Sequence, residues 1–328
     1  MRTFALICAV LIVVCLAAAG CTTTPSGNAT SNTTSNTSAA GTKITMSGAF
    51  ALYPMVIKWT EEYKKIHPEV TIEVSGGGAG KGMTDALNGL ADIGMVSREI
   101  YPQEIQKGAF AVAVAKDAVV GTINVNNPVL ADLNAKGVTN VTLKAICVNE
   151  TVTSWGDLVG RSDVTGKITV YTRSDACGAA TVWANYMGYN QEDLKGVGVY
   201  GDPGLADAVK NDKLGIGYNN IGFAYDPTTL KPQSGLAILK LDQNGNGVID
   251  PSEEVYATRT DIVNAIQSGN YPSPPARELY LVGAGPFTGA SKDFVTWILT
   301  DGQQYEIDTG FIPLTPDRQQ SELAKVKG

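Results

Sequence analysis

The chain has 328 residues and a formal net charge of −7 at pH 7, which argues against nucleic acid as its partner. It holds a single histidine, His67, which argues against a zinc site with several histidine ligands and against a histidine-based catalytic triad. The negative charge does not exclude an anionic ligand, because helix N-termini and one arginine attract an anion locally.

Residues 1–21 predict an export signal. Arg2 precedes an uncharged stretch over 4–20, which closes on small residues before a cysteine. Because it ends on Gly20-Cys21, the segment resembles the lipoprotein type of signal, in which Cys21 carries the lipid. The alternative is an uncleaved N-terminal anchor, although the apolar stretch is short for a membrane span. Both interpretations place the rest of the chain at the extracellular face of the cell membrane.

Residues 22–42 predict a disordered tether. The segment is rich in threonine, asparagine and serine and has no charge, so it lacks the apolar surface that folding requires. It contains three N-x-[ST] triplets, at Asn28, Asn32 and Asn36, which are acceptor sites for glycosylation in a lineage that glycosylates surface proteins.

From residue 43 onward, strand-like runs alternate with helical patterns, as in "TIEVS", "AFAVAV", "KITVYT" and "ELYLVG". This alternation predicts an α/β fold with mainly parallel sheet, and the length is sufficient for two domains. Residues 74–87, "VSGGGAGKGMTDAL", look like a nucleotide-binding loop but fail both common motifs. What remains is a glycine loop before a helix N-terminus, which favours an anion of any kind.

Three stretches, 44–65, 74–100 and 168–187, each predict a strand, a glycine turn and a helix. Together they resemble the PstS-like substrate-binding proteins of phosphate ABC transporters, which have the type II periplasmic-binding-protein fold. The resemblance extends over later segments such as "GIGYNNIGFAYD" (215–226) and "SKDFVTWILTDGQQYEIDTGFIPL" (291–314). It implies a two-lobed, Venus-flytrap α/β architecture with central mixed, mainly parallel sheets and two crossover strands.

The resemblance also implies domain boundaries and a binding site. The first lobe is expected at 43–120 plus 278–328 and the second at 121–277, with crossings near Val119–Asn124 and Tyr271–Glu278. Arg173 is expected to donate two parallel hydrogen bonds to an oxyanion, with Asp175 orienting the guanidinium. Lys81 is a weaker candidate for reaching the anion. The expected ligand-binding residues are Ala49, Phe50, Ala51, Gly78, Ala79, Gly80, Ser97, Arg173, Asp175, Cys177, Gly178 and Ala179.

Several of these positions lack the hydroxyls of the family's phosphate pocket, notably Phe50, Ala79, Cys177 and Ala179. Each lost hydroxyl removes a hydrogen bond worth roughly 1–3 kcal/mol to a charged ligand, so phosphate specificity does not transfer automatically. We expect an extracellular solute-binding lipoprotein, not an enzyme, which captures phosphate for an ABC permease and is monomeric. Alternatives are another anion (tungstate, molybdate, sulfate or a larger ester) or a non-transport role in surface adhesion or sensing. A phosphatase would need a nucleophile beside a base, and none is evident.

A second signal lies at residues 242–253, which match the full EF-hand calcium spacing. Gly247 stands at position 6, where the loop turns sharply. We expect a structural Ca²⁺ here that braces a loop of the second lobe. The alternative is a polar turn insertion. The expected ligands are Asp242, Asn244, Asn246, Val248 (through its carbonyl), Asp250 and Glu253.

Two cysteines remain in the mature chain besides the lipid site, Cys147 and Cys177. Two thiols in an exported domain are often bridged, but the sequence leaves the bonded and the free state equally open.

Overall fold

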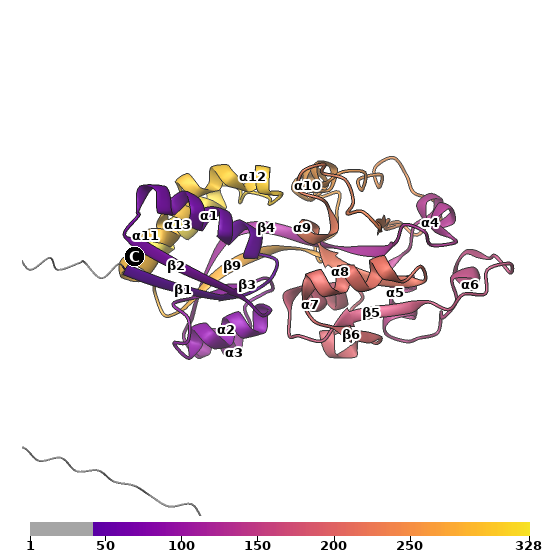
Figure 1. The fold of residues 1–328 in the computed structure, drawn as a ribbon, viewed down its shortest axis with the longest axis horizontal. Coiled ribbons are helices and arrows are strands. Elements are labelled where there is room, and N and C mark those ends of the chain that lie inside the picture. Colours follow the sequence, from indigo (N-terminus) through magenta and orange to yellow (C-terminus); the bar gives the residue numbers. More distant parts are fainter. Residues whose placement is uncertain (1–41) are drawn as a thin grey trace, which may run out of the picture. The chain divides into compact units, whose positions relative to one another are not determined.

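The computed structural model describes residues 42–328, which form one compact unit (Figure 1). The predicted signal, the lipidation site Cys21 and the tether up to residue 41 lie outside the described residues. Among residues 42–328 no helix is long and apolar enough to cross a membrane.

Nine strands are hydrogen-bonded in the order β2-β1-β3-β9-β4-β7-β5-β6, with β8 paired to β4. The outer pairs β1–β2, β1–β3, β5–β6 and β5–β7 are parallel, whereas every pair that contains β4 or β9 is antiparallel. The predicted α/β fold with a mixed sheet is therefore confirmed, but the sheet is not mainly parallel, because four of these eight strand pairs are antiparallel. The strands are β1 Thr42–Gly48, β2 Val70–Gly76, β3 Ile93–Val96, β4 Ala109–Asn124, β5 Thr169–Arg173, β6 Val197–Val199, β7 Gly215–Asn220, β8 Leu236–Leu239 and β9 Ala276–Ala284.

Helices follow most strands, as the alternating pattern predicts. They are α1 Tyr53–Ile66, α2 Ala79–Leu87, α3 Pro102–Gln106, α4 Leu130–Lys136, α5 Asn140–Cys147, α6 Trp155–Val159, α7 Gly178–Tyr186, α8 Gly201–Asn211, α9 Ile221–Ala224, α10 Arg259–Ser268, α11 Gly289–Ile298, α12 Glu306–Thr309 and α13 Pro316–Lys327, with 3₁₀ turns at Gln191–Asp193 and Asp301–Tyr305. The spacing of buried residues explains α1, where Met55, Val56, Trp59 and Tyr63 recur on one face.

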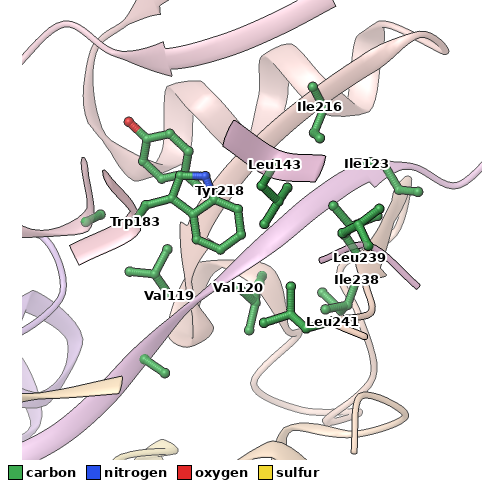
Figure 2. Close-up of a cluster of buried hydrophobic side chains, with 14 of the residues drawn as sticks. Val119, Val120, Ile123, Leu143, Trp183, Ile216, Tyr218, Ile238, Leu239 and Leu241 are labelled. Atoms are coloured by element: carbon green, nitrogen blue, oxygen red, sulfur yellow. The ribbon is translucent and has the colours of Figure 1, made fainter. Parts of the chain in front are cut away.

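Two hydrophobic cores divide the described chain into two lobes. The first core gathers β1, β3, α1 and α11 around Trp59 and Phe294, both fully buried. The second core lies around Trp183, whose ring stacks on Tyr218 with centroids 5.8 Å apart (Figure 2). Burying aromatic side chains of this size supplies much of the stabilisation of each lobe.

The strands β4 and β9 run through both lobes (Figure 1). On β4 the buried side chains belong to the first core up to Ala115 and to the second core from Ala118. On β9 the buried side chains change from the second core to the first between Ala276 and Leu279. The sequence prediction puts the first crossing at 119–124, a few residues later, where β4 already pairs with β7.

Candidate anion-binding site

Three loops that join a strand to a helix meet where the two lobes touch. The N–H of Gly78, after β2, donates to the carbonyl of Gly48 at 3.0 Å, and the N–H of Gly80 donates to the carbonyl of Ala176 at 3.0 Å. The second bond links the first lobe to the second. Each loop leads into the first turn of a helix, α1, α2 or α7, where backbone N–H groups have no partner within the helix.

Two glycines permit this close approach. Gly78 has φ of 89°, a backbone conformation that residues with a side chain rarely adopt. A Cβ atom at Gly178 would overlap the carbonyl oxygen and hydroxyl of Ser97, which is itself buried. The start of α7 therefore packs directly against Ser97, and any larger residue at position 178 would push the lobes apart.

Arg173, at the end of β5, is buried and bound by two carboxylates. Its Nε and Nη2 donate to the two oxygens of Asp175 at 2.7 and 2.5 Å, and its Nη1 donates to Asp202 at 2.6 Å. Burial opposes the charge, but the carboxylates outweigh it and hold the pKa of the guanidinium above its ordinary value. The guanidinium of Arg173 is thus hydrogen-bonded to carboxylates of the protein itself. Its one positive charge is surrounded by two negative charges.

Asp202 is a site residue that the sequence analysis missed. It lies in the first turn of α8 and is fully buried, and its carboxylate also accepts from the N–H of Asn220 at 3.0 Å and from Asn220 Nδ2 at 2.7 Å. Asn220 accepts in turn from Arg277, which pairs with Asp117 at 2.8 Å. This buried chain of polar groups connects Arg173 to the crossing strands β4 and β9.

The predicted residues of the first loop form an apolar cover over this cluster. The guanidinium of Arg173 lies 5.5 Å from the centroid of the Phe50 ring, and Phe50 meets Tyr200 edge-on at 5.9 Å. Ala49 and Ala51 on either side are buried. The loop therefore contributes hydrophobic contact and a cation–π interaction rather than hydroxyl groups.

The charge of Lys81 is engaged within the first lobe. Its amino group donates to Asp85 and, at 3.0 Å, to the hydroxyl of Ser47. Burial raises the pKa of Asp85, but the bonds from Lys81 and Ser47 outweigh it and leave the pKa below its usual range. Lys81 thus serves as a partner of Asp85.

The start of α7 offers hydrogen-bond donors. The sulfur of Cys177 accepts from the N–H of Ala180 at 3.4 Å and so caps the helix. Within residues 42–328, no acceptor meets the N–H groups of Gly178 and Ala179, nor that of Ala79 at the start of α2. These three backbone groups at helix N-termini are suited to an oxyanion.

Cys147 and Cys177 are both buried and not bonded to each other. Both lie in the second core, where burial raises the pKa of each thiol to about 12. The disulfide that the sequence left open is therefore absent from this structure, and neither thiol is ionised at neutral pH.

A cavity of about 170 Å³ adjoins the meeting point of the loops. Gly80 and Cys177 of the predicted set line it, together with Ala176, Arg98 and Thr181. Phe50 and Arg173 lie outside its lining. The structure thus brings the predicted residues together at the interlobe contact, but the cavity opens beside Cys177 and not above the guanidinium.

A protein-family model described as "PBP superfamily domain" matches residues 28–302. The chain belongs to the PBP superfamily. It is 25% identical over 280 residues to the phosphate-binding protein PstS of Bacillus subtilis, covering 84% of this chain and 82% of that protein. The PstS of Methanocaldococcus jannaschii is 24% identical over 364 aligned positions, covering 94% and 90%.

The fold of this PBP protein also matches solved structures. A putative phosphate ABC transporter substrate-binding protein of Clostridium perfringens, solved with bound phosphate, superimposes with a TM-score of 0.67 at 24% identity, covering 83% of this chain and all of that one. An ABC-type phosphate transport receptor of Vibrio cholerae gives 0.59 at 20% identity, with 83% and 100% coverage. The predicted two-lobed binding-protein fold is confirmed.

The predicted calcium loop of this PBP protein wraps around Asp242. Its carboxylate accepts from the N–H groups of Gly245 at 2.7 Å and Gly247 at 2.8 Å, and Gly247 has φ of 80°. The two oxygens of Glu253 accept from the N–H groups of Gln243 and Asp250. Over the described range 42–328, no three His, Cys, Asp or Glu side chains converge on a common metal position. The carboxylates of Asp242 and Glu253 therefore bind the loop's own backbone, and Asp250 accepts from the side-chain amides of Asn244 and Asn246.

Proposed function

We propose that this protein captures an oxyanion, phosphate before others, between its two lobes and delivers it to an ABC permease without chemical change. One observation carries the proposal: three helix N–H groups without a protein acceptor, at Ala79, Gly178 and Ala179, lie at the interlobe contact near Arg173. The named functions of the PstS relatives agree with it.

The surrounding charge bears on which anion binds. Arg173 is matched by Asp175 and Asp202, so the site has one more carboxylate than guanidinium. A carboxylate near the ligand accepts a hydrogen bond from a protonated oxyanion and repels a fully ionised one. This favours phosphate, which carries a proton at neutral pH, over sulfate, molybdate and tungstate.

The test is a calorimetric titration of the full chain with phosphate, then with sulfate, molybdate and tungstate. We expect phosphate to bind with a dissociation constant near the micromolar range, about 8 kcal/mol. Arg173→Gln should weaken it at least tenfold, whereas Arg161→Gln, which breaks an exposed ion pair with Asp163, should leave it unchanged. If none of the four ions gives heat, the proposal fails, and a larger ester or a surface adhesion or sensing role takes its place.

The anchoring and the partner are parts of the same proposal. We infer that Cys21 carries a lipid at the extracellular face of the membrane and that the protein acts as a monomer beside its permease. The support is the sequence up to Cys21 and the transport proteins among its relatives. Incorporation of a labelled fatty acid that disappears in Cys21→Ser supports it, and persistent labelling of that variant contradicts it.

We also propose that the loop 242–253 binds Ca²⁺ as a structural ion. The support is the complete EF-hand spacing and the near-complete burial of Asp242 and Glu253, at 3% and 4% exposed, in a loop whose other residues are mostly exposed. Because two of the ligands are amides, we expect weak, extracellular-type affinity. Calcium should raise the thermal midpoint of the wild type relative to a chelator, but not that of Glu253→Gln. Equal midpoints with calcium and with chelator in the wild type would contradict this.

A further inference from the structure

Four arginines are buried within the described chain, and one of them differs from the rest. Arg259 is 4% exposed, yet it has no carboxylate within ion-pair distance in residues 42–328. A buried charge without a counter-ion is costly, and proteins retain one mainly where something else compensates it. Each of the other three contacts a carboxylate: Arg98 with Glu104 at 2.6 Å, Arg173 with Asp202 at 2.6 Å and Arg277 with Asp117 at 2.8 Å.

The backbone fixes the position of Arg259. It is the first residue of α10, Thr258 caps that helix, and its N–H donates to the carbonyl of Leu230 at 2.7 Å. Its side chain makes one hydrogen bond, from Nη2 to the carbonyl of Asp308 at 3.1 Å. In the part of the chain that the structure describes, its Nε and Nη1 meet no acceptor. Burial lowers the pKa of Arg259, with Asp226 opposing, but a guanidinium stays charged at neutral pH.

Arg259 lines a cavity of about 290 Å³ between α10 and α12, which lie next to each other (Figure 1). From α10 the cavity receives the amides of Asn264 and Gln267 and the side chain of Val263. The facing wall holds Ile307 and Asp308 of α12. The cavity thus combines a guanidinium that forms no ion pair within the described range, neutral amides and apolar walls, a combination typical of small-molecule sites, with one carboxylate, that of Asp308, at the facing wall. It shares no residue with the Arg173 site.

We propose that this cavity binds a small organic anion, a carboxylate or a phosphate monoester with an apolar body. The guanidinium presents free N–H groups that match the oxygens of such an anion. Asn264 and Gln267 add neutral hydrogen bonds, and Val263 and Ile307 contact the apolar part. An inorganic ion would leave these apolar walls unused, so the cavity favours the organic ligand. The proposal stands independently of the function proposed for the Arg173 site.

The test is a calorimetric titration of the full chain with phenyl phosphate and with benzoate, which separate the two sources of the anion. At least one probe should bind the wild type with a submillimolar dissociation constant. Arg259→Gln should weaken that binding at least tenfold, whereas Arg259→Lys, which keeps the charge, should weaken it less. Titration with inorganic phosphate should be the same in Arg259→Gln and wild type, and an equal thermal midpoint shows that the variant is folded.

A second variant keeps the arginine in place. Ile307 is 63% exposed, so Ile307→Asp should not disturb folding, but it adds a second carboxylate, beside Asp308, to the cavity wall opposite Arg259. It should weaken the same probe by several-fold, and Ile307→Asn should weaken it less. The proposal is overturned if neither probe binds the wild type, if both bind Arg259→Gln as tightly as wild type, or if Ile307→Asp has no effect.

Discussion

Arg173 and Arg259 are both buried, at 8% and 4% exposed, but they differ in the charge around them. Carboxylates already accept three of the five N–H groups of Arg173, from Asp175 and Asp202. Arg259 donates to one carbonyl and meets no carboxylate over residues 42–328. A buried guanidinium alone therefore does not locate an anion. At Arg173 an anion depends on backbone N–H groups, whereas at Arg259 it would meet the guanidinium directly.

The largest effect is expected at Arg173. Arg173→Leu leaves Asp175 and Asp202 buried without a counter-ion, which should lower the free energy of unfolding by about 3–5 kcal/mol. Urea unfolding measures it. The control Arg161→Leu removes an exposed ion-pair partner and should change stability by no more than about 1 kcal/mol. If Arg173→Leu also lost no more than about 1 kcal/mol, the burial of Asp175 and Asp202 would not require Arg173 as their counter-ion.

Glu306 is the acidic counterpart of Arg259. It is fully buried, its Oε1 accepts from Gln303 Nε2 at 2.6 Å, and no cation pairs with it within 42–328. Burial raises its pKa from 4.5 to about 9, although the bond from Gln303 opposes the shift. The folded protein thus keeps a proton that the unfolded chain releases. The contribution of Glu306 to stability is therefore fully present below about pH 4.5 and is lost as the pH rises towards 9.

The next largest effect is therefore expected from Glu306→Gln. The amide cannot ionise, so the variant should exceed the wild type in stability by an amount on the order of 3 kcal/mol at pH 7. The gain should be much smaller at pH 5, where the unfolded chain is also partly protonated. Urea unfolding at pH 5, 7 and 8 measures the difference. A difference that does not vary with pH would mean that Glu306 is ionised in the folded protein.

The sequence predicts local structure well in this protein, because the signals are local. The stretch 44–65 predicts a strand, a turn and a helix, and β1 and α1 occur there; the same is true of β2 with α2 and β5 with α7. Arg173 and Asp175 are two residues apart, so their pairing could be expected from the sequence. The fold class and one of the two carboxylates at Arg173, that of Asp175, could thus be predicted from the sequence.

Contacts between distant residues were not accessible from the sequence. Asp202 is 29 residues from Arg173, and Asp117 is 160 residues from Arg277, so no periodicity or spacing connects them. The bond from Gly80 to Ala176 depends on how the lobes meet, which local patterns do not encode. The only local signal for Asp202 was an acidic residue just after Tyr200-Gly201 at a helix start, where aspartate commonly interacts with the helix dipole.

A smaller effect is expected from Asp202→Asn, which reduces the excess of carboxylates at Arg173. The asparagine oxygen still accepts a hydrogen bond, but the negative charge is gone, so sulfate affinity should rise by about tenfold, or roughly 1.4 kcal/mol. Phosphate affinity should rise less, because its proton suits a carboxylate. Asp207→Asn, at an exposed position of the same helix, is the control. If both ions gain equally, the charge of Asp202 does not select between them.

The smallest effect is expected from Arg259→Leu in the absence of ligand. The change removes one hydrogen bond to a carbonyl, worth about 0.5–1.5 kcal/mol, but it also removes a charge that is buried without a counter-ion. The two terms oppose each other, so the free energy of unfolding should stay within about 1 kcal/mol of wild type. Arg277→Leu leaves Asp117 buried without a counter-ion, so it should lower the free energy of unfolding by about 3–5 kcal/mol in the same urea experiment. If both variants lose as much, Arg259 stabilises the fold through its contact with α12, and its lack of a carboxylate no longer indicates a ligand.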